Sequence, residues 1–256
     1  MANLSSLWDG LNPHLLAHFY EVEPIDSEEK RHWSRTLESP VVTCAVSESS
    51  LQADLQWQSP FENTGAEAKI PTLSSMLQNG AIQQFSDSLI PSRWANEKVT
   101  SALDEYVGRT GITRLNSTQV FSGMPPVKIN VTVHFRAWRS ARQEVERPFS
   151  QLMKWALPRK LSEDGSIIAR LADKAQGSGE SAAETLMPSL TPSIIGMTYK
   201  GRTFSPLVIE SIDFPMSSPI NEEGDFVHLA IQMTLCTLTA IDGDDWDDFN
   251  SKSIVL

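Results

Sequence analysis

Hydrophobic and polar residues alternate most regularly between residues 126 and 138. The apolar positions are Val127, Ile129, Val131, Val133, Phe135 and Ala137, and the positions between them are Lys128, Asn130, Thr132, His134, Arg136 and Trp138. A period of two places successive side chains on opposite sides of an extended backbone. The pattern therefore predicts a long antiparallel strand with one apolar and one polar face.

Three other stretches also alternate hydrophobic and polar residues. Residues 227–236 alternate apolar with polar side chains and predict a second long strand. Residues 195–214 predict a hairpin that turns at Lys200-Gly201-Arg202. Residues 40–58 predict another hairpin, with alternation on both sides of a serine-rich turn.

Helical spacing predominates elsewhere. One apolar stripe runs from Ala141 to Ala156 after a candidate N-cap at Ser140, with Pro148 either kinking the helix or beginning it, and Pro158 ends it. Residues 61–115 predict a helical insertion, and residues 1–39, with a short apolar helical face around Leu11 to Phe19, predict an arm. The Gly- and Ser-rich stretch within residues 162–190 predicts a loop.

Together these elements predict an α+β protein whose centre is an antiparallel β-sandwich with one flanking helix. We expect the core to comprise residues 40–60 and 116–245, with an N-terminal arm at 1–39, a helical insertion at 61–115 and an acidic C-terminal tail at 246–256.

Composition narrows the functional classes. The chain has 256 residues and a formal net charge of −11, which argues against a protein that grips duplex DNA through a basic stripe. An acidic protein can still line a channel along which DNA slides. The two cysteines, Cys44 and Cys236, lie in strand-like apolar contexts and predict buried free thiols. No signal-peptide pattern and no apolar run of about 20 residues appears, so we expect no membrane partner and synthesis in the cytoplasm.

Candidate chemistry is sparse. The cluster from Asp242 to Asp248 lacks EF-hand spacing and is interpreted as a solvated acidic tail or a charged contact with a neighbour. His14 and His18 are four residues apart, as in some zinc sites, but no third ligand accompanies them. Nucleophile, phosphate-loop and paired-carboxylate motifs are not recognisable. The sequence therefore predicts no enzyme, no metal and no cofactor.

Three segments carry a resemblance to a known family. They are the strand 127–137 with the following Arg142-Gln143-Glu144-Val145-Glu146-Arg147-Pro148-Phe149, the β unit Gly196–Tyr199 continuing through Val208–Phe214, and the last strand Phe226 to Thr239 with its Asp-Trp tail. These segments resemble the core of phage tail-tube-fold proteins, in particular the tube initiators at the baseplate of contractile tails. The stretch Pro71–Gly80 is similar to the linker of such junction proteins.

The resemblance implies a sandwich subunit of a sixfold ring, in which the sheets of neighbouring subunits join around a central channel and each strand's edges are sealed by the next subunit. It implies as partners the tail tube protein and a baseplate hub or second junction protein, with DNA passing through unbound. We expect the polar strand faces to meet the channel or a neighbouring subunit, and the candidate residues are Lys128, Asn130, Thr132, His134, Arg136, His228, Gln232 and Thr234.

Two alternatives stay open at this point. A tail terminator or other connector ring would share the ring architecture, and a tail-associated cell-wall hydrolase would need a cleft with two carboxylates or a Cys/His pair.

Overall fold

The computed structural model describes residues 2–26, 31–58, 118–161 and 189–250. It divides into two compact units, one formed by residues 1–54 with 125–256 and the other by residues 55–124. The protein is a mixed α/β molecule with a large, mostly antiparallel sheet and, in the described residues, few helices. None of the helices in this part of the chain has the length and apolarity that crossing a bilayer requires.

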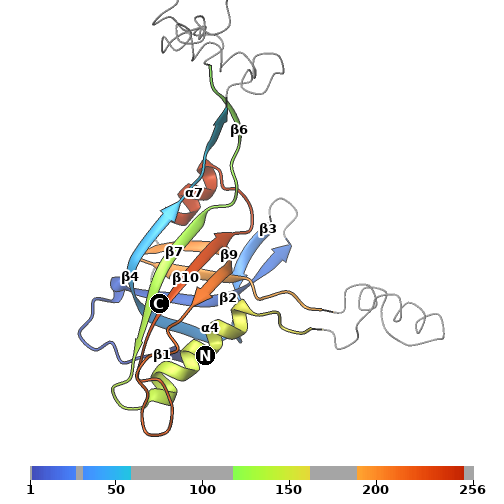
Figure 1. Cartoon of the computed structure of the whole chain (residues 1–256). Helices are drawn as coiled ribbons and strands as arrows, with labels where there is room; N and C mark the ends of the chain where they lie inside the picture. The colour runs from blue at the N-terminus through green and yellow to red at the C-terminus, as the bar shows by residue number, and fades with distance from the viewer. Residues whose placement is uncertain (1, 27–30, 59–117, 162–188, 251–256) are drawn as a thin grey trace, which may run out of the picture. The chain divides into compact units, whose positions relative to one another are not determined.

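The large sheet belongs to the first unit and has the strand order β1-β4-β7-β10-β9-β8-β2-β3 (Figure 1). Its strands are β1 (Asn3–Ser5), β2 (Leu16–Asp26), β3 (Arg31–Arg35), β4 (Val41–Gln52), β7 (Lys128–Arg136), β8 (Ile195–Tyr199), β9 (Arg202–Asp213) and β10 (His228–Thr237). Only the short β1 runs parallel to its neighbour, β4, among these pairings.

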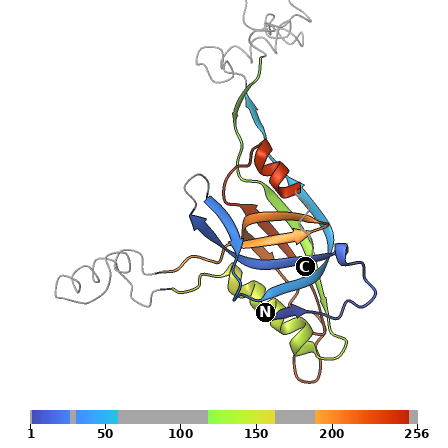
Figure 2. The ribbon, with the colours of Figure 1, turned by 180° about the vertical axis from the view of Figure 1, so that it is seen from behind.

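The sheet closes on itself. Besides pairing with β8, strand β2 pairs with β4 from Leu16 opposite Ala45 to Phe19 opposite Val42. The strands β4, β7, β10, β9, β8 and β2 therefore form a complete circuit. Figure 2 shows the orange β8–β9 ribbon beside the blue ribbon of β2, crossing the direction of the strands behind them.

The two long alternating strands are confirmed. On β7 the residues Ile129, Val131, Val133 and Phe135 are buried while the residues between them are partly or fully exposed, and β10 repeats the pattern. The buried side chains of both strands point to the inside of the circuit. There they pack with Phe19, Val42, Met197, Leu207 and their neighbours in one core. Burial of this apolar surface, at about 25 cal/mol per Å², is what selects the register of each strand.

The circuit is closed over only part of its length. Strand β4 pairs on both sides as far as Ala45, and from Val46 to Gln52 it pairs only with β7 among the described strands. Likewise β9 pairs with β8 up to Leu207, and from Val208 to Asp213 its only partner in the described part of the chain is β10. The strands β4-β7-β10-β9 thus form a four-stranded sheet, here called the open half, with one-sided segments along both outer strands.

The expectation that the edges of the two long strands themselves await a neighbouring molecule is wrong. Within the chain β7 lies between β4 and β10, and β10 lies between β7 and β9. The one-sided edges lie one strand further out on each side.

The helix after β7 begins as a π-helical turn, η3 (Arg142–Glu146), and continues as α4 (Arg147–Ala156). Pro148 is the second residue of α4 and follows the π-helical turn directly, and this local change of helix type accommodates a residue that has no backbone N–H. The backbone N–H of Gln143 donates to Ser140 Oγ, as a capping serine allows. Leu152 and Trp155 are the buried residues of the apolar stripe, and the helix ends at Ala156, with Leu157 as its C-cap before Pro158.

The N-terminal residues do not form an arm, and the prediction of a helical face around Leu11 to Phe19 is wrong. After the short 3-10 turn η1 (Pro13–Leu15), the chain enters β2, where Ala17 and Phe19 are fully buried. The helical spacing of Leu15, Leu16 and Phe19 competes with the alternation of Ala17, Phe19 and their polar neighbours. Pairing with β4 and β8 stabilises the strand, so this segment is extended and not helical.

The predicted hairpin at residues 40–58 is also wrong. Residues 41–52 are one strand, β4, with a bulge between Ser47 and Ser50 where Glu48 has a positive φ of 47°. The serine-rich run that favours a turn is accommodated by this bulge. The short β5 (Gln56–Gln58) belongs to the second unit, where it pairs with β6 (Val120–Gly123) and Trp57 packs edge-on against Phe121.

The acidic C-terminal segment is a helix rather than a solvated tail as far as residue 250. It forms α7 (Gly243–Asn250), and Asp242 accepts a hydrogen bond from the N–H of Asp245 in the manner of an N-cap. Phe249 is buried and its ring lies 5.4 Å from that of Phe204. The predicted insertion at 61–115, nearly all of the loop at 162–190 and residues 251–256 lie outside the described residues.

Candidate functional site

The eight residues that the sequence singles out lie together on the outward face of β7 and β10. The register places Arg136 opposite His228, Thr132 opposite Gln232 and Asn130 opposite Thr234. Directly opposed residues of antiparallel strands share one face of the sheet. Lys128 and His134 have the same parity on β7 and complete the set.

The flanking strands widen this surface, which we call the polar face. One row across the open half reads Ser47, Thr132, Gln232 and Asp213, and the next reads Ser50, Asn130, Thr234 and Ser211. Most of these side chains are uncharged hydroxyls and amides.

The sequence pattern does not predict which residues of β4 and β9 belong to the polar face. On β9 the register shifts between Thr234 and Leu235 of β10, so that Glu210 is an extra residue between Ile209 and Ser211. On β4 the bulge from Ser47 to Ser50 does the same. Each bulge interrupts the period of two, which is the only local signal that assigns a residue to a face.

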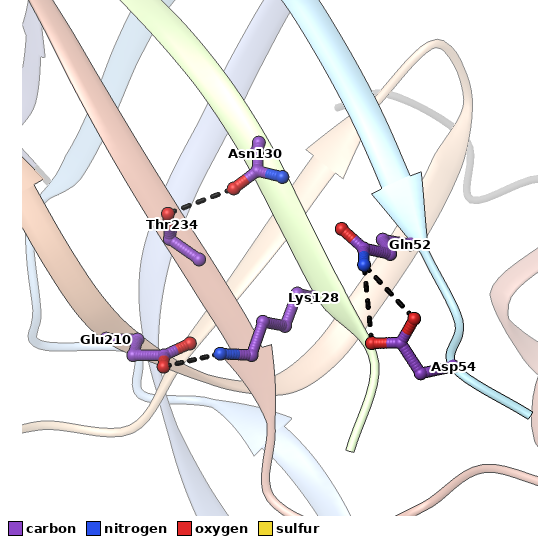
Figure 3. A network of polar contacts seen from close by, with 6 residues as sticks. All are labelled: Gln52, Asp54, Lys128, Asn130, Glu210 and Thr234. Carbon is purple, nitrogen blue, oxygen red and sulfur yellow. Dashed lines mark hydrogen bonds and ion pairs between the residues drawn. The ribbon is translucent and has the colours of Figure 1, made fainter. Parts of the chain in front are cut away.

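Polar contacts bind the strands of this face together, as Figure 3 shows. The ammonium of Lys128 lies 2.6 Å from Glu210 Oε1, and the Thr234 hydroxyl donates to Asn130 Oδ1 at 3.0 Å. The Gln52 amide donates to Asp54. The hydrogen bond to Glu210 is the main reason that the pKa of Lys128 is raised, so this cation stays protonated and paired.

Two histidines lie near the other end of the polar face. His134 Nε2 is 2.6 Å from Ser47 Oγ, and its ring lies 6.2 Å from that of His228. Partial burial lowers the pKa of His134, the proximity of His228 lowers it further, and Glu48 opposes both effects. The imidazole is therefore held neutral at pH 7, where it can share a hydrogen bond with Ser47.

The basic end of β7 is also engaged. The guanidinium of Arg136 lies over the ring of Trp138 at 4.6 Å, a cation–π contact. The backbone N–H of Arg136 donates to Ser6 Oγ, which in turn donates to the Glu144 carbonyl. These contacts hold the end of β7 against η3.

A shallow depression of about 340 Å³ lies in the middle of the polar face. Its lining includes Glu48, Asn130, Asp213, Gln232 and Thr234. Hydroxyl and amide groups of this kind exchange hydrogen bonds with water or a partner, and the hydroxyl–imidazole pair of the polar face, Ser47 with His134, lies outside this lining.

The other sequence candidates are placed elsewhere. His14 lies in η1 and His18 on β2, so they share no helix face, and among the described residues no group of three His, Cys, Asp or Glu could hold a metal. Cys44 is buried and burial raises the pKa of its thiol, whereas Cys236 is only partly buried. The expectation of two buried thiols is thus right for Cys44 alone.

The chain matches no model of a known protein family, and it matches no curated protein.

Proposed function

We propose that this chain is a structural subunit of a ring in a contractile phage tail, joining the tail tube to the baseplate and nucleating the tube. The observation that carries the proposal is the open half. It combines a polar outward face with one-sided segments on β4 (Val46–Gln52) and on β9 (Val208–Asp213).

Strand direction makes the two edges compatible. Each neighbour in the series β4-β7-β10-β9 is antiparallel, so β4 and β9 run in opposite directions. The β9 edge of one copy placed beside the β4 edge of the next continues the antiparallel order. Such a head-to-tail contact repeats until the rotation closes a ring, which also removes the exposed edges.

The polar face then lines the channel. Its rows consist mainly of neutral hydroxyl and amide groups, and its basic residues Lys128 and Arg136 are engaged by Glu210 and Trp138. Arg136 keeps its charge over Trp138, but the carboxylates of Glu48, Asp213 and Glu210 outnumber these two cations, so DNA would release few counterions on meeting this surface. DNA would therefore pass along it without binding.

The remaining parts of the proposal rest on the tail-tube resemblance. The closed sheet is the sandwich, α4 is its flanking helix, and six copies form the ring. The axial partners are the tail tube protein and a hub or second junction protein, the site of action is the virion, and the role is not enzymatic.

Cysteine cross-linking tests the edge contact. Ser50 and Ser211 are exposed and end the same row on opposite edges. Within one chain they are three strand spacings apart, about 14 Å, too far for a disulfide. We expect Ser50→Cys/Ser211→Cys, in a Cys236→Ser background and with a short bis-maleimide, to give a ladder of covalent oligomers ending at a closed ring on denaturing gels.

Ser150→Cys/Ser217→Cys is the matched control, since both serines are exposed and neither lies on the open half. A ladder of equal intensity from this pair, or no ladder from the edge pair at concentrations where negative-stain images show rings, would contradict the proposal. Gold labelling of particles should place the protein at the baseplate end; labelling at the capsid end would indicate a terminator instead.

A further inference from the structure

A second depression, of about 220 Å³, lies at the end of the closed sheet on its apolar side. Residues of β4, β7, β8 and β9 line it, and Trp246 of α7 completes the wall. It shares Ser50 with the polar face, and Ser49, Ser50 and Leu51 of its lining belong to the one-sided segment of β4, so we expect a free subunit to bind a ligand here and the proposed ring contact to adjoin the mouth.

The inner wall of this depression is part of the hydrophobic core. Ile129, Val131, Met197 and Phe204 line it and are each less than 10% exposed. Leu51 and Trp246 stand at its mouth, with 38% and 39% of their surface exposed. Ligand pockets are typically of this kind, apolar inside with a few polar groups that fix orientation.

The charged groups that line the mouth are cationic. Although α7, which supplies Trp246, carries aspartates on both sides of it, among the described residues the lining includes Lys200 and Arg202, on either side of Gly201, and no acidic side chain. That is distinctive in a chain with a net charge of −11. The tight turn, with φ of 51° at Lys200 and 73° at Gly201, joins β8 to β9, and the Lys200 ammonium lies 5.0 Å from the ring centroid of Tyr199.

We propose that this depression binds a short alkyl carboxylate. The alkyl chain lies against Ile129, Val131, Met197 and Phe204, and the carboxylate meets Lys200 and Arg202. A dry cavity of about 150 Å³ holds benzene, so the larger volume here accommodates an alkyl chain of about eight carbons, as in octanoate. Charge complementarity selects the carboxylate over an alcohol or an ammonium of the same length.

Calorimetric titration of the full chain tests the ligand class. We expect octanoate, below its micellar concentration, to bind saturably with one site per chain. 1-Octanol and octylammonium should bind at least about tenfold more weakly, because neither supplies an anion. No saturable binding of octanoate, or equal binding of octylammonium, would overturn the assignment.

Variants locate the site. Lys200→Gln/Arg202→Gln changes only exposed side chains and should weaken octanoate binding at least about tenfold. Lys154→Gln/Arg159→Gln removes the same charge from exposed positions outside the depression and should leave binding unchanged. Octanoate should also shift tryptophan emission in the parent but not in Trp246→Phe. Equal affinity in both charge variants, or an unchanged emission shift in Trp246→Phe, would place octanoate elsewhere and refute the proposal.

Discussion

At the scale of single residues, one buried carboxylate organises the chain between β7 and its helix. Glu144 is 7% exposed, and its two oxygens accept hydrogen bonds from the backbone N–H groups of Trp138, Arg139 and Ser140. Those N–H groups precede the helix and have no helical acceptor of their own. The Glu144 carboxylate thus takes the place of backbone carbonyl acceptors for these N–H groups, and it stabilises the turn that follows β7.

Glu144→Gln tests this arrangement. The amide keeps the shape but loses the negative charge and places a donor where an acceptor is needed, so we expect a loss of about 1–3 kcal/mol in the free energy of unfolding. Chemical denaturation measures it. Gln143→Ala, at an exposed neighbouring position, should change stability by less than about 0.5 kcal/mol; equal effects would mean that the turn does not depend on the carboxylate.

His18 makes stability depend on pH. Its Nδ1 lies 3.0 Å from Thr43 Oγ1, which donates to Asn3 Oδ1, so Nδ1 carries the proton that the pair requires. Burial, and then the charge of Arg35, lowers the pKa of His18. As pH falls through the unfolded value of about 6.5, the unfolded chain therefore takes up the proton first and stability falls.

We expect the melting temperature to decrease from pH 7.5 to pH 5.5, and His18→Gln to flatten that dependence. His14→Gln is the control, because His14 is exposed on η1. A pH profile that is unchanged in His18→Gln would assign the dependence to other groups, with His134, whose pKa is also lowered, the next to test.

At the scale of elements, α4 stabilises the sheet by packing. Leu152 and Trp155 are at most 2% exposed, and α4 contacts β9, β4 and β1. Ring contact between Phe149 and Phe214, at 4.6 Å, extends this packing to the end of β9. The helix therefore packs against β4 and β9, the two strands whose outer edges form the contact between subunits in the proposed ring.

Leu152→Ala should lower the free energy of unfolding by about 2–5 kcal/mol, because it removes buried methyl groups and leaves a cavity. Lys154→Ala, on the exposed side of the same helix, should have little effect on stability. If urea denaturation gives similar values for both variants, α4 contributes little to the fold.

Sequence patterns predict elements whose period is uninterrupted. Strands β7 and β10 and the hairpin at Lys200-Gly201 follow from local alternation, and so do the eight residues of the polar face on β7 and β10. Bulges at Glu48 and Glu210 shift the period and conceal what β4 and β9 contribute. For β2 the local sequence fits both helical spacing and strand alternation, and pairing with β4 and β8, which are distant in sequence, selects the strand.

At the scale of the whole molecule, the charge of the polar face determines its affinity for nucleic acid. In the proposed channel, Glu210 pairs with Lys128, and Glu48 and Asp213 line the central depression. We expect Glu48→Lys/Asp213→Lys/Glu210→Lys to create a basic surface that retains DNA with an affinity that falls as salt rises. Filter binding at two salt concentrations measures this.

The parent should retain no DNA under the same conditions. Glu38→Lys/Glu222→Lys/Glu223→Lys is a control that changes the net charge by the same amount at exposed acidic residues beyond the polar face. Equal DNA retention by both variants would show that overall charge, rather than this surface, is responsible.

The partial closure of the sheet separates folding from polymerisation. Because β2 and β8 complete the circuit around a core drawn from a single chain, a dissolved subunit can be native before it meets another. In the proposed assembly, folded subunits would therefore accumulate first and form rings only on contact with a template. Taking such a ring apart would return intact subunits rather than denatured chains.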